Sequence, residues 1–597
     1  MTSEPHEHLH EASPRLVHWV VPIGIVLAAV LYLVLQAMPT QDADEYDFGT
    51  FGAIPVSADG RVKPLDTVAR TSLALLSGKQ SFELDGRPQP AIRWLADVLA
   101  RGEDAQHYKV FRIDHHDVQT LIGQHDPVGH YFSLTQIQPH WRNVVEQGQR
   151  AFDVPSRNRN AYQNAVLQLY RQVTTFMNLS TMQEPYMVPP VSEDDEWAPF
   201  MRVVQDAHAT GVTHPAIEPI TTMMEAYHER EPEAFNAAAR RYRDAFVESM
   251  PPTARRASFE VFFNRFAPFY QATGLYVLAF LITGASLFMR NSRVSNRWAA
   301  ETFGQAAFWL LVLTFVLHTF GLAARIYLQG RPPVTNLYSS AIFVGWGAVL
   351  LALILERIYR LGLGSLVAAT IGFVTLIIAH NLAGDGDTMQ MMQAVLDSNF
   401  WLATHVITIT IGYSATFLAG LLGIVYIFMG VATRSLSPEL HRSLSTMVYG
   451  MVCFALLFSF VGTVLGGIWA DQSWGRFWGW DPKENGAALI VLMHAIILHA
   501  RWGGMIKARG MMVLAVSGNI ICAWAWFGTN LLGVGLHSYG FMDGAAHWLM
   551  AFVLSQLVII SVGLIPLEAW RSQPYRRPLA AIQASDDILP PPKSIDD

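Results

Sequence analysis

The segment from Trp469 to Asn485 concentrates residues suited to binding a large, flat, acidic ligand. It reads WADQSWGRFWGWDPKEN, with four tryptophans in twelve residues, glycines between the indoles and a charged run after them. Scattered tryptophans at a membrane surface usually form an interfacial belt. This density instead favours an aromatic platform, because indoles stack on planar ligands and cations pair with carboxylates. We expect haem as the ligand, with Arg476 or Lys483 pairing with its propionates.

Three histidines are candidate haem ligands. His405 and His537 each stand at the end of an apolar segment, one before and one after the tryptophan-rich segment. Either alone fits a structural interfacial histidine equally well, but as a pair they predict bis-imidazole ligation of one iron. His499 lies inside the next apolar segment, about 20 Å from its start at 1.5 Å per residue. Because an ionisable group at membrane depth is functional by default, His499 predicts a second, intramembrane haem site.

The composition indicates a membrane protein that positions these residues on helices. Of 597 residues, 51% are hydrophobic and only 15% are charged, against roughly 25% charged in soluble proteins. Ten apolar runs are long enough to span a bilayer. They cover residues 18–38, 268–289, 302–328, 338–356, 364–382, 399–430, 444–469, 486–502, 511–530 and 547–567. The predicted fold is mostly α: a polytopic membrane bundle with a mainly helical extracytoplasmic domain after the first span.

Charges in the short loops predict the orientation of the bundle. Thirteen Arg and Lys residues occupy one set of loops and the tail, and only Arg331, Arg476 and Lys483 occupy the opposite set. By the positive-inside rule both termini are cytoplasmic. The predicted organisation is then a cytoplasmic tail, an anchor, an extracytoplasmic domain with helices near 160–180 and 232–250, a transmembrane domain and a second cytoplasmic tail. Their ranges are 1–17, 18–38, 39–267, 268–567 and 568–597.

Other chemistries are excluded by what the sequence lacks. Its two cysteines, Cys453 and Cys522, both lie in apolar runs, and no CxxC or CxxCH motif occurs. Thiol redox chemistry, a disulfide framework and covalently held haem are therefore not expected. The net charge of −7 comes without a basic block, so no nucleic-acid partner is expected.

The tryptophan-rich segment and four further motifs resemble the CcsA (ResC) family of System II cytochrome c biogenesis. The tryptophan-rich segment resembles the WWD signature of haem-handling proteins, and its Asp-Pro-Lys-Glu ending resembles the CcsA form. GRPPVTNLY at 330–338, WLATH at 401–405, LHAR at 498–501 and GVGLHSYG at 533–540 are similar to further family motifs. The stretch IPVSADGRVKPLDT at 54–67 resembles the region before the CcsA part of fused CcsB–CcsA proteins.

The resemblance implies a multi-pass protein of the bacterial inner membrane that acts as a holocytochrome c synthase (haem lyase) subunit. It would carry haem b across the membrane and present it for thioether attachment to the CxxCH motif of apocytochromes c. The implied external ligands are His405 and His537, and the implied intramembrane ligand is His499. The implied platform is Trp469, Trp474, Gly475, Arg476, Trp478, Trp480, Asp481, Pro482, Lys483 and Glu484.

The implied partners are apocytochrome c, thiol-reducing proteins that keep CxxCH reduced, and a CcsB/ResB-like membrane protein. That last partner is expected to supply the second ligand of the intramembrane haem, because this chain does not show the several spans of CcsB. His18, His318 and His380 are the alternatives within the chain. Three other functions stay open: a haem exporter without ligation activity, a System I protein of the CcmF or CcmC type, and a quinol-reactive cytochrome b-like subunit.

Overall fold

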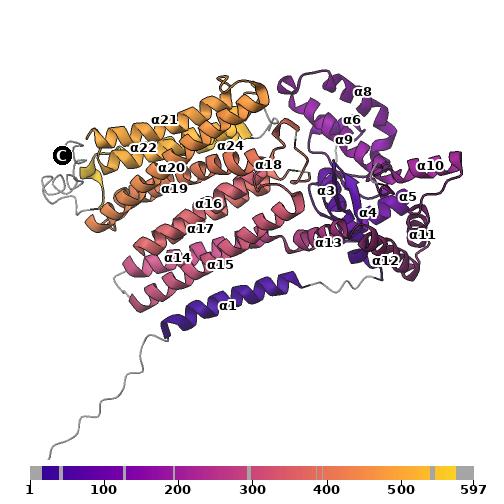
Figure 1. Cartoon of the computed structure of the whole chain (residues 1–597), viewed down its shortest axis with the longest axis horizontal. Coiled ribbons are helices and arrows are strands. Elements are labelled where there is room, and N and C mark those ends of the chain that lie inside the picture. The colour runs from indigo at the N-terminus through magenta and orange to yellow at the C-terminus, as the bar shows by residue number, and fades with distance from the viewer. Residues whose placement is uncertain are drawn as a thin grey trace, which may run out of the picture.

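A bundle of long helices carries a separate globular domain at one end (Figure 1). The computed structural model describes residues 17–38, 45–125, 129–192, 195–291, 297–384, 386–392, 394–537 and 545–572. Among these residues, ten helical segments are long and apolar enough to cross a membrane. They coincide with the ten spans predicted from hydropathy, so the mostly α, polytopic fold is confirmed.

The membrane helices lie side by side and roughly parallel to one another (Figure 1). Their bounds are α1 Val17–Ala37, α14 Pro268–Asn291, α15 Arg297–Gln329, α16 Leu337–Tyr359, α17 Leu363–Leu382, α18 Asn399–Trp401, α19 Ile407–Ala432, α20 Pro438–Trp474, α21 Pro482–Trp502, α22 Ala508–Ala523, α23 Thr529–Leu531 and α24 Ala545–Gly563. Two π-helical turns interrupt them, Leu402–Val406 between α18 and α19 and Trp524–Gly528 between α22 and α23.

Residues 45–267, here called the head domain, have their own hydrophobic core, which runs from Phe48 to Ala254. The helices are α2 Phe48–Gly52, α3 Leu65–Ser77, α4 Ala91–Ala100, α5 Gly102–Ala105, α6 His116–Leu121, α7 Leu134–Ile137, α8 Trp141–Phe152, α9 Ala161–Ser180, α10 Phe200–Thr210, α11 Ile217–His228, α12 Pro232–Ser249 and α13 Pro251–Phe266. Helices predicted near 160–180 and 232–250 are thus present as α9 and α12.

Three short antiparallel hairpins accompany these helices. They pair β1 Pro55–Ala58 with β2 Arg61–Pro64, β3 Ser81–Leu84 with β4 Arg87–Pro90, and β5 Phe111–Arg112 with β6 Tyr131–Phe132. The first two turn through Asp59-Gly60 and Asp85-Gly86, whose four φ values are all positive. Asp-Gly is the preferred sequence for such two-residue turns.

The last helix of the head domain, α13, runs into the first helix of the following bundle segment, α14, with one break between them. Ala267 takes the left-handed conformation (φ +45°) between α13 and α14. The stretches nearest the two termini, at Val17 and Ser572, lie at the end of the bundle away from the head domain (Figure 1). We call the two ends of the bundle the head end and the tail end.

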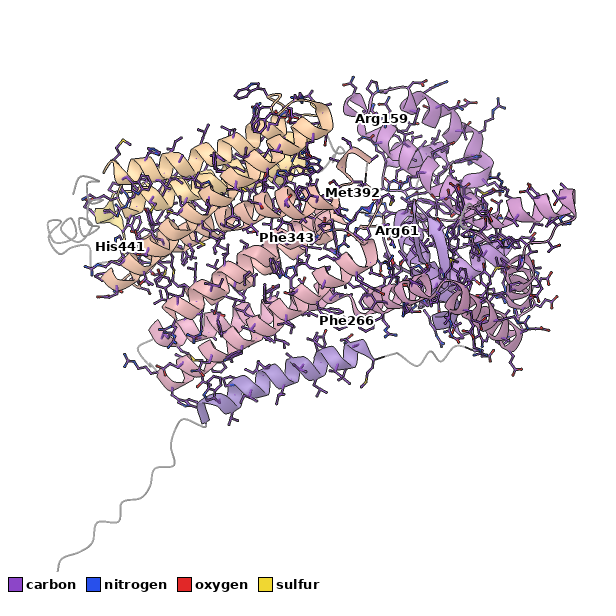
Figure 2. All side chains as sticks on the ribbon, in the orientation of Figure 1. Arg61, Arg159, Phe266, Phe343, Met392 and His441 are labelled. Atoms are coloured by element: carbon purple, nitrogen blue, oxygen red, sulfur yellow. The ribbon has the colours of Figure 1, made fainter. Side chains whose placement is uncertain are left out.

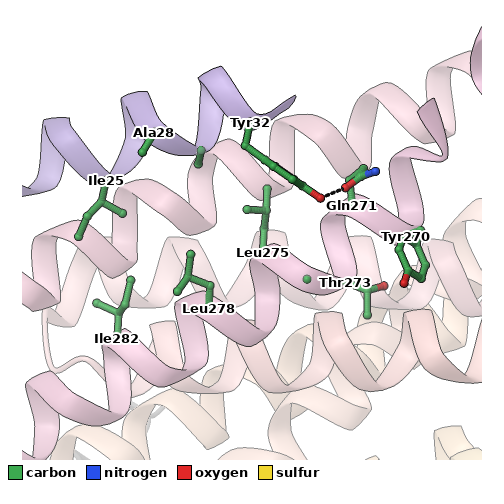
Figure 3. Close-up of a pocket in the computed structure, with 11 residues that line it drawn as sticks. Ile25, Ala28, Tyr32, Tyr270, Gln271, Thr273, Leu275, Leu278 and Ile282 are labelled. Carbon is green, nitrogen blue, oxygen red and sulfur yellow. Dashed lines mark hydrogen bonds between the residues drawn. The ribbon is translucent and has the colours of Figure 1, made fainter. Parts of the chain in front are cut away.

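Helix α1 lies along the edge of the bundle, where it packs on α15 and touches α14 near the head end. The rings of Trp19 and Trp309 lie 6.5 Å apart. Near the head end the Tyr32 hydroxyl donates a 2.5 Å hydrogen bond to Oε1 of Gln271. Between this contact and Ile282, helices α1 and α14 leave an apolar pocket of about 690 Å³ (Figure 3).

Candidate functional site

His405 stands on a π-helical turn at the head end of the bundle. The turn, Leu402–Val406, adds width to the helix between α18 and α19; π-turns of this kind are frequent at functional sites. The His405 ring lies against the backbone of α20, where Nδ1 is 2.8 Å from the Gly462 carbonyl oxygen. A Cβ on Gly466 would lie 2.6 Å from the imidazole, so glycine at this position admits the ring.

The head end of α20 brings aromatic rings to both external histidines. Trp469 lies 5.8 Å from the His405 ring and stacks on Trp401 at 6.3 Å. Trp474 meets the His537 ring edge-on at 4.6 Å. The sequence reading treated 469–485 as one loop, but the helix continues through Trp474 and ends at Gly475, whose φ is +69°. The first two tryptophans are therefore held on a helix, one and a half turns apart.

The Asp-Pro-Lys-Glu run forms the N-terminal cap of α21. Oδ1 of Asp481 accepts hydrogen bonds from the backbone N–H groups of Lys483 and Glu484. The Glu484 carboxylate in turn accepts from the N–H groups of Asp481 and Gly479. This reciprocal capping box, with proline at the first helical position, is a strong helix start. It fixes the direction in which the loop leaves the helix.

The other oxygen of the same aspartate holds His537. Oδ2 of Asp481 is hydrogen-bonded to Nδ1 of His537. Gly535 allows this approach, because it has a φ of +90° and a Cβ there would lie 2.8 Å from that of Asp481. Asp481 therefore orients His537 while it caps α21. The sequence analysis placed Asp481 only among the platform residues, although its N-cap position is readable from the Asp-Pro-x-Glu spacing.

These two hydrogen bonds determine which nitrogen each imidazole offers to a metal. A carbonyl oxygen and a carboxylate only accept, so Nδ1 must carry the proton in both His405 and His537. The lone pair of each neutral ring is then on Nε2. A histidine anchored through Nδ1–H and ligating through Nε2 is the usual arrangement at metal sites.

The two cations of the segment have different surroundings. The Lys483 ammonium is buried and donates to the carbonyl oxygens of Ala525 and Trp526, at 3.1 and 2.8 Å, in the second π-turn. It therefore ties α21 to α22. Arg476 lies over Gly479 and 3.8 Å from Glu484, with a third of its side chain exposed. Of the two cations expected to pair with propionates, Arg476 is the more accessible.

The tip of the loop carries the remaining tryptophans. The rings of Trp478 and Trp480 meet edge to face at 6.0 Å. Trp480 is 74% exposed and has a positive φ of +60°, an unusual conformation for a large side chain. The neighbouring cap holds this conformation, since the Trp480 carbonyl accepts a hydrogen bond from the Asn485 amide. Residues 538–540, the end of the GVGLHSYG motif, lie outside the described part of the chain.

His499 is in the last turn of α21, far from the external pair. It is the eighteenth residue of the helix, about 25 Å from the capping box at 1.5 Å per residue, so it lies near the tail end of α21. Its side chain is exposed on the bundle surface and lies 6.0 Å from the Trp502 ring. Its Nδ1 is 2.8 Å from the Ala495 carbonyl oxygen, which again leaves the lone pair on Nε2.

The alternative intramembrane ligands within the chain have other surroundings. His318 is fully buried in α15, with Nδ1 3.1 Å from the Tyr276 hydroxyl. His380 is exposed in the last turn of α17, at the head end of the bundle. The side chain of His18 lies outside the described part of the chain.

Asp481, Glu484 and His537 also have the spacing of a metal site, with one ligand atom from each lying within 4.8 Å of the others. The capping box and the Asp481–His537 hydrogen bond account for this geometry without an ion. The arrangement is instead that of a histidine ligand with its supporting carboxylate.

Substitution of Asp481 separates its two roles. Asparagine caps helices as well as aspartate does, but its amide has one oxygen, which the backbone N–H groups of 483 and 484 occupy. The NH₂ group would then face Nδ1 of His537 and favour the tautomer with the proton on Nε2. We expect Asp481→Asn to lower haem affinity roughly 10- to 100-fold without loss of thermal stability. Asp481→Ala should in addition destabilise the protein by about 1 kcal/mol.

Haem titration and thermal unfolding of the two purified variants measure these effects. Wild-type haem affinity in Asp481→Asn would show that the carboxylate serves only as a cap.

Comparison with known proteins identifies the membrane half. Residues 334–537 match the family model described as cytochrome C assembly protein. NrfI of Wolinella succinogenes is 26% identical over 511 residues, which cover 82% of this chain and 54% of NrfI. CcsA of Prochlorococcus marinus strain NATL2A is 28% identical over 300 residues, covering 44% of this chain and 94% of that protein.

CcsA of Parasynechococcus marenigrum is 29% identical over 307 residues, covering 46% of this chain and 99% of that protein. The chain thus matches CcsA proteins over nearly their full length and NrfI over about half of its length. Over residues 334–537 the chain is therefore similar to the cytochrome C assembly proteins, and its membrane half is similar to CcsA-type cytochrome c biogenesis proteins.

Proposed function

We propose that the chain presents haem b to apocytochrome c at a site formed by His405, His537 and the aromatic rings beside them. One observation carries the proposal: two imidazoles flank the tryptophan-rich segment at the head end, and each is anchored through Nδ1–H. Two such rings suit the two axial positions of one haem iron. The head end would be extracytoplasmic and both termini cytoplasmic, in a bacterial inner membrane.

The reaction is the addition of each CxxCH thiol across one haem vinyl group. The sulfur bonds to one vinyl carbon and the thiol hydrogen goes to the other, so no group leaves and no oxidant is consumed. The thiols must be reduced beforehand, which calls for thiol-reducing proteins. Cys453 and Cys522 lie within α20 and α22, and the substrate supplies the reacting sulfur.

The contribution of the protein is to hold the haem in a fixed position for the incoming thiols. A haem fixed at the head end lets each vinyl group meet its thiol as a local event instead of a rare encounter. The histidine of CxxCH would then replace one of the two protein ligands, and the product would be free to leave once the other protein histidine also dissociates from the iron. Trp469 and Trp474, both on α20, limit the movement of the His405 and His537 rings. Arg476 is suited to bind a propionate.

Delivery of haem from the tail end would involve His499 and a CcsB/ResB-like partner. The exposed His499 ring belongs to a bundle face that also exposes Leu492, Ile496 and Trp502. An imidazole on an apolar outer face is accessible to a second membrane protein, whose histidine would be the other ligand of the same haem iron. Fully buried His318 is less suited to that role, because packed side chains surround it.

Expression in a bacterium that lacks its own c-type maturation system tests the proposal. A reporter apocytochrome with one CxxCH motif, together with this chain and a CcsB-like partner, should accumulate covalently bound haem, measured by haem stain after denaturing electrophoresis. A reporter with both cysteines changed to alanine is the matched control. Haem bound to the chain without any covalent product on the reporter would favour the haem-exporter alternative.

A further inference from the structure

The β1–β2 hairpin of the head domain reaches the segment that leads to His405 through a buried ion cluster. We define this cluster as Arg61, Lys63, Glu260 and Asp387. Arg61 donates to both oxygens of Glu260 at 2.7 and 2.9 Å and, through Nε, to Asp387 at 2.8 Å. Lys63 donates to the same Asp387 oxygen at 3.2 Å. Figure 2 shows Arg61 beside Met392, where the head domain meets the bundle.

The cluster is nearly sealed from solvent. The side chains of Lys63, Glu260 and Asp387 are at most 3% exposed, and that of Arg61 is 12% exposed. Burial alone would raise the pKa of Asp387, but the charges of Arg61 and Lys63 lower it to about 2. The carboxylate therefore stays ionised at physiological pH. Lys63 also donates to the exposed carboxylate of Asp59 at 2.7 Å.

Such a cluster is not an efficient way to raise folding stability. Removing two cations and two carboxylates from water is costly, and well-packed apolar side chains often stabilise a protein as well or better. The cluster instead fixes the relative positions of three segments, because Arg61 bonds the hairpin both to α13 and to the 386–392 segment. Its bidentate bond to Glu260 restricts the geometry further.

The same segment is held from the bundle side. Arg325 donates to the Thr388 side chain and carbonyl at 2.9 and 2.8 Å, and the Asn336 amide donates to that carbonyl at 2.9 Å. Further along, Nε of Arg331 donates to Asp397 at 2.9 Å. Two residues later α18 begins and leads into the π-turn of His405. Contacts from the head domain and from the bundle thus fix the chain that leads to α18 and His405.

We propose that Arg61 and Asp387 are positioning residues for the external haem site, through which the head domain sets the placement of His405. The inference rests on the proposed haem ligation by His405. It assigns the GRVKPLDT stretch a role in aligning the site, beyond the folding of its own domain.

The first test is Asp387→Asn in the full chain, purified with haem bound. The variant should accumulate in the membrane like wild type. Its external haem should change from the six-coordinate low-spin spectrum toward a five-coordinate spectrum, and haem retention should fall roughly 10-fold or more. Added imidazole should restore the six-coordinate spectrum, because it fills the position that His405 no longer reaches. A matched control is Arg241→Met, which breaks an exposed ion pair of the same domain, 3.3 Å to Glu218.

A disulfide provides the converse test. The Cβ of a residue at Gly60 would lie 3.5 Å from that of Met391, which falls within the range of a disulfide. Gly60 has a φ of +80°, so the pair Gly60→Cys and Met391→Cys is first checked in the wild-type background. In the Asp387→Asn background the oxidised pair should restore six-coordinate haem, and reduction should abolish it again.

The outcomes separate the inference from the proposed function. A wild-type spectrum in Asp387→Asn, or a disulfide that restores protein level without restoring six-coordinate haem, overturns the positioning role. Failure of both the variant and its tethered form to accumulate would mean that the cluster serves folding as a whole, and it would also count against the inference. If His405→Gly likewise leaves the haem spectrum unchanged, it is the proposed ligation that fails.

Discussion

Replacement of His405 or His537 by glycine is expected to reduce cytochrome c maturation by more than roughly 100-fold, the upper limit of what loss of a supporting group at a metal site costs. Each substitution removes one axial ligand, while the anchors Gly462 and Asp481 stay in place. Glycine costs only about 1 kcal/mol in a helix, so the protein should still accumulate. Covalent haem on a CxxCH reporter measures the effect.

Added imidazole should restore part of the activity in either single variant, because it fits the space that the side chain vacates. The double variant is the control, since it lacks both ligands and should not recover with imidazole or with externally supplied haem. Normal maturation in both single variants would remove these histidines from the mechanism.

His499→Ala is expected to empty both haem sites when haem comes only from the cytoplasm. The residue is about 25 Å along α21 from the capping box, too far to contact a haem held by His405 and His537. Its effect on the external site would therefore come from interrupted delivery. Haem counts and reduced spectra of the purified protein with a CcsB-like partner measure both sites.

Two comparisons isolate the delivery step. Externally supplied haem should load the external site of His499→Ala, but not that of the His405→Gly, His537→Gly double variant. His208→Ala is a matched control, because His208 is exposed on a helix and has the same Nδ1 contact to the carbonyl four residues earlier, at 2.8 Å. Normal loading of the external site from endogenous haem would contradict the two-site route and leave His499 a structural residue.

Hydropathy located all ten spans, because long apolar runs dominate the signal for membrane helices. Helix ends were less predictable. Hydropathy ended the seventh span at Trp469, yet α20 continues through Ala470 and the polar residues 471–473 until Gly475 allows a left-handed turn. The hairpins of the head domain were missed, although Asp59-Gly60 and Asp85-Gly86 carried the signal of two-residue turns.

The chemistry of the external site was easier to predict than its support. The types and order of His405, the tryptophans and His537 are visible in the sequence. Contacts such as His405 with the Gly462 carbonyl depend on how two helices cross, which no local pattern specifies. The bond from Arg61 to Asp387 joins residues 326 positions apart, and nothing in either neighbourhood indicates the other.

The π-turn at Leu402–Val406 gives this site an unusual genetic sensitivity. A single π-turn contains one residue more than the α-helix that would replace it. Loss of one codon there would restore a regular helix and rotate its two sides against each other by about 100°. The imidazole would then leave the carbonyl of Gly462 and the space beside Gly466. In evolutionary terms, a one-residue gap in an aligned relative would signal loss of this ligand geometry even where the histidine itself remains.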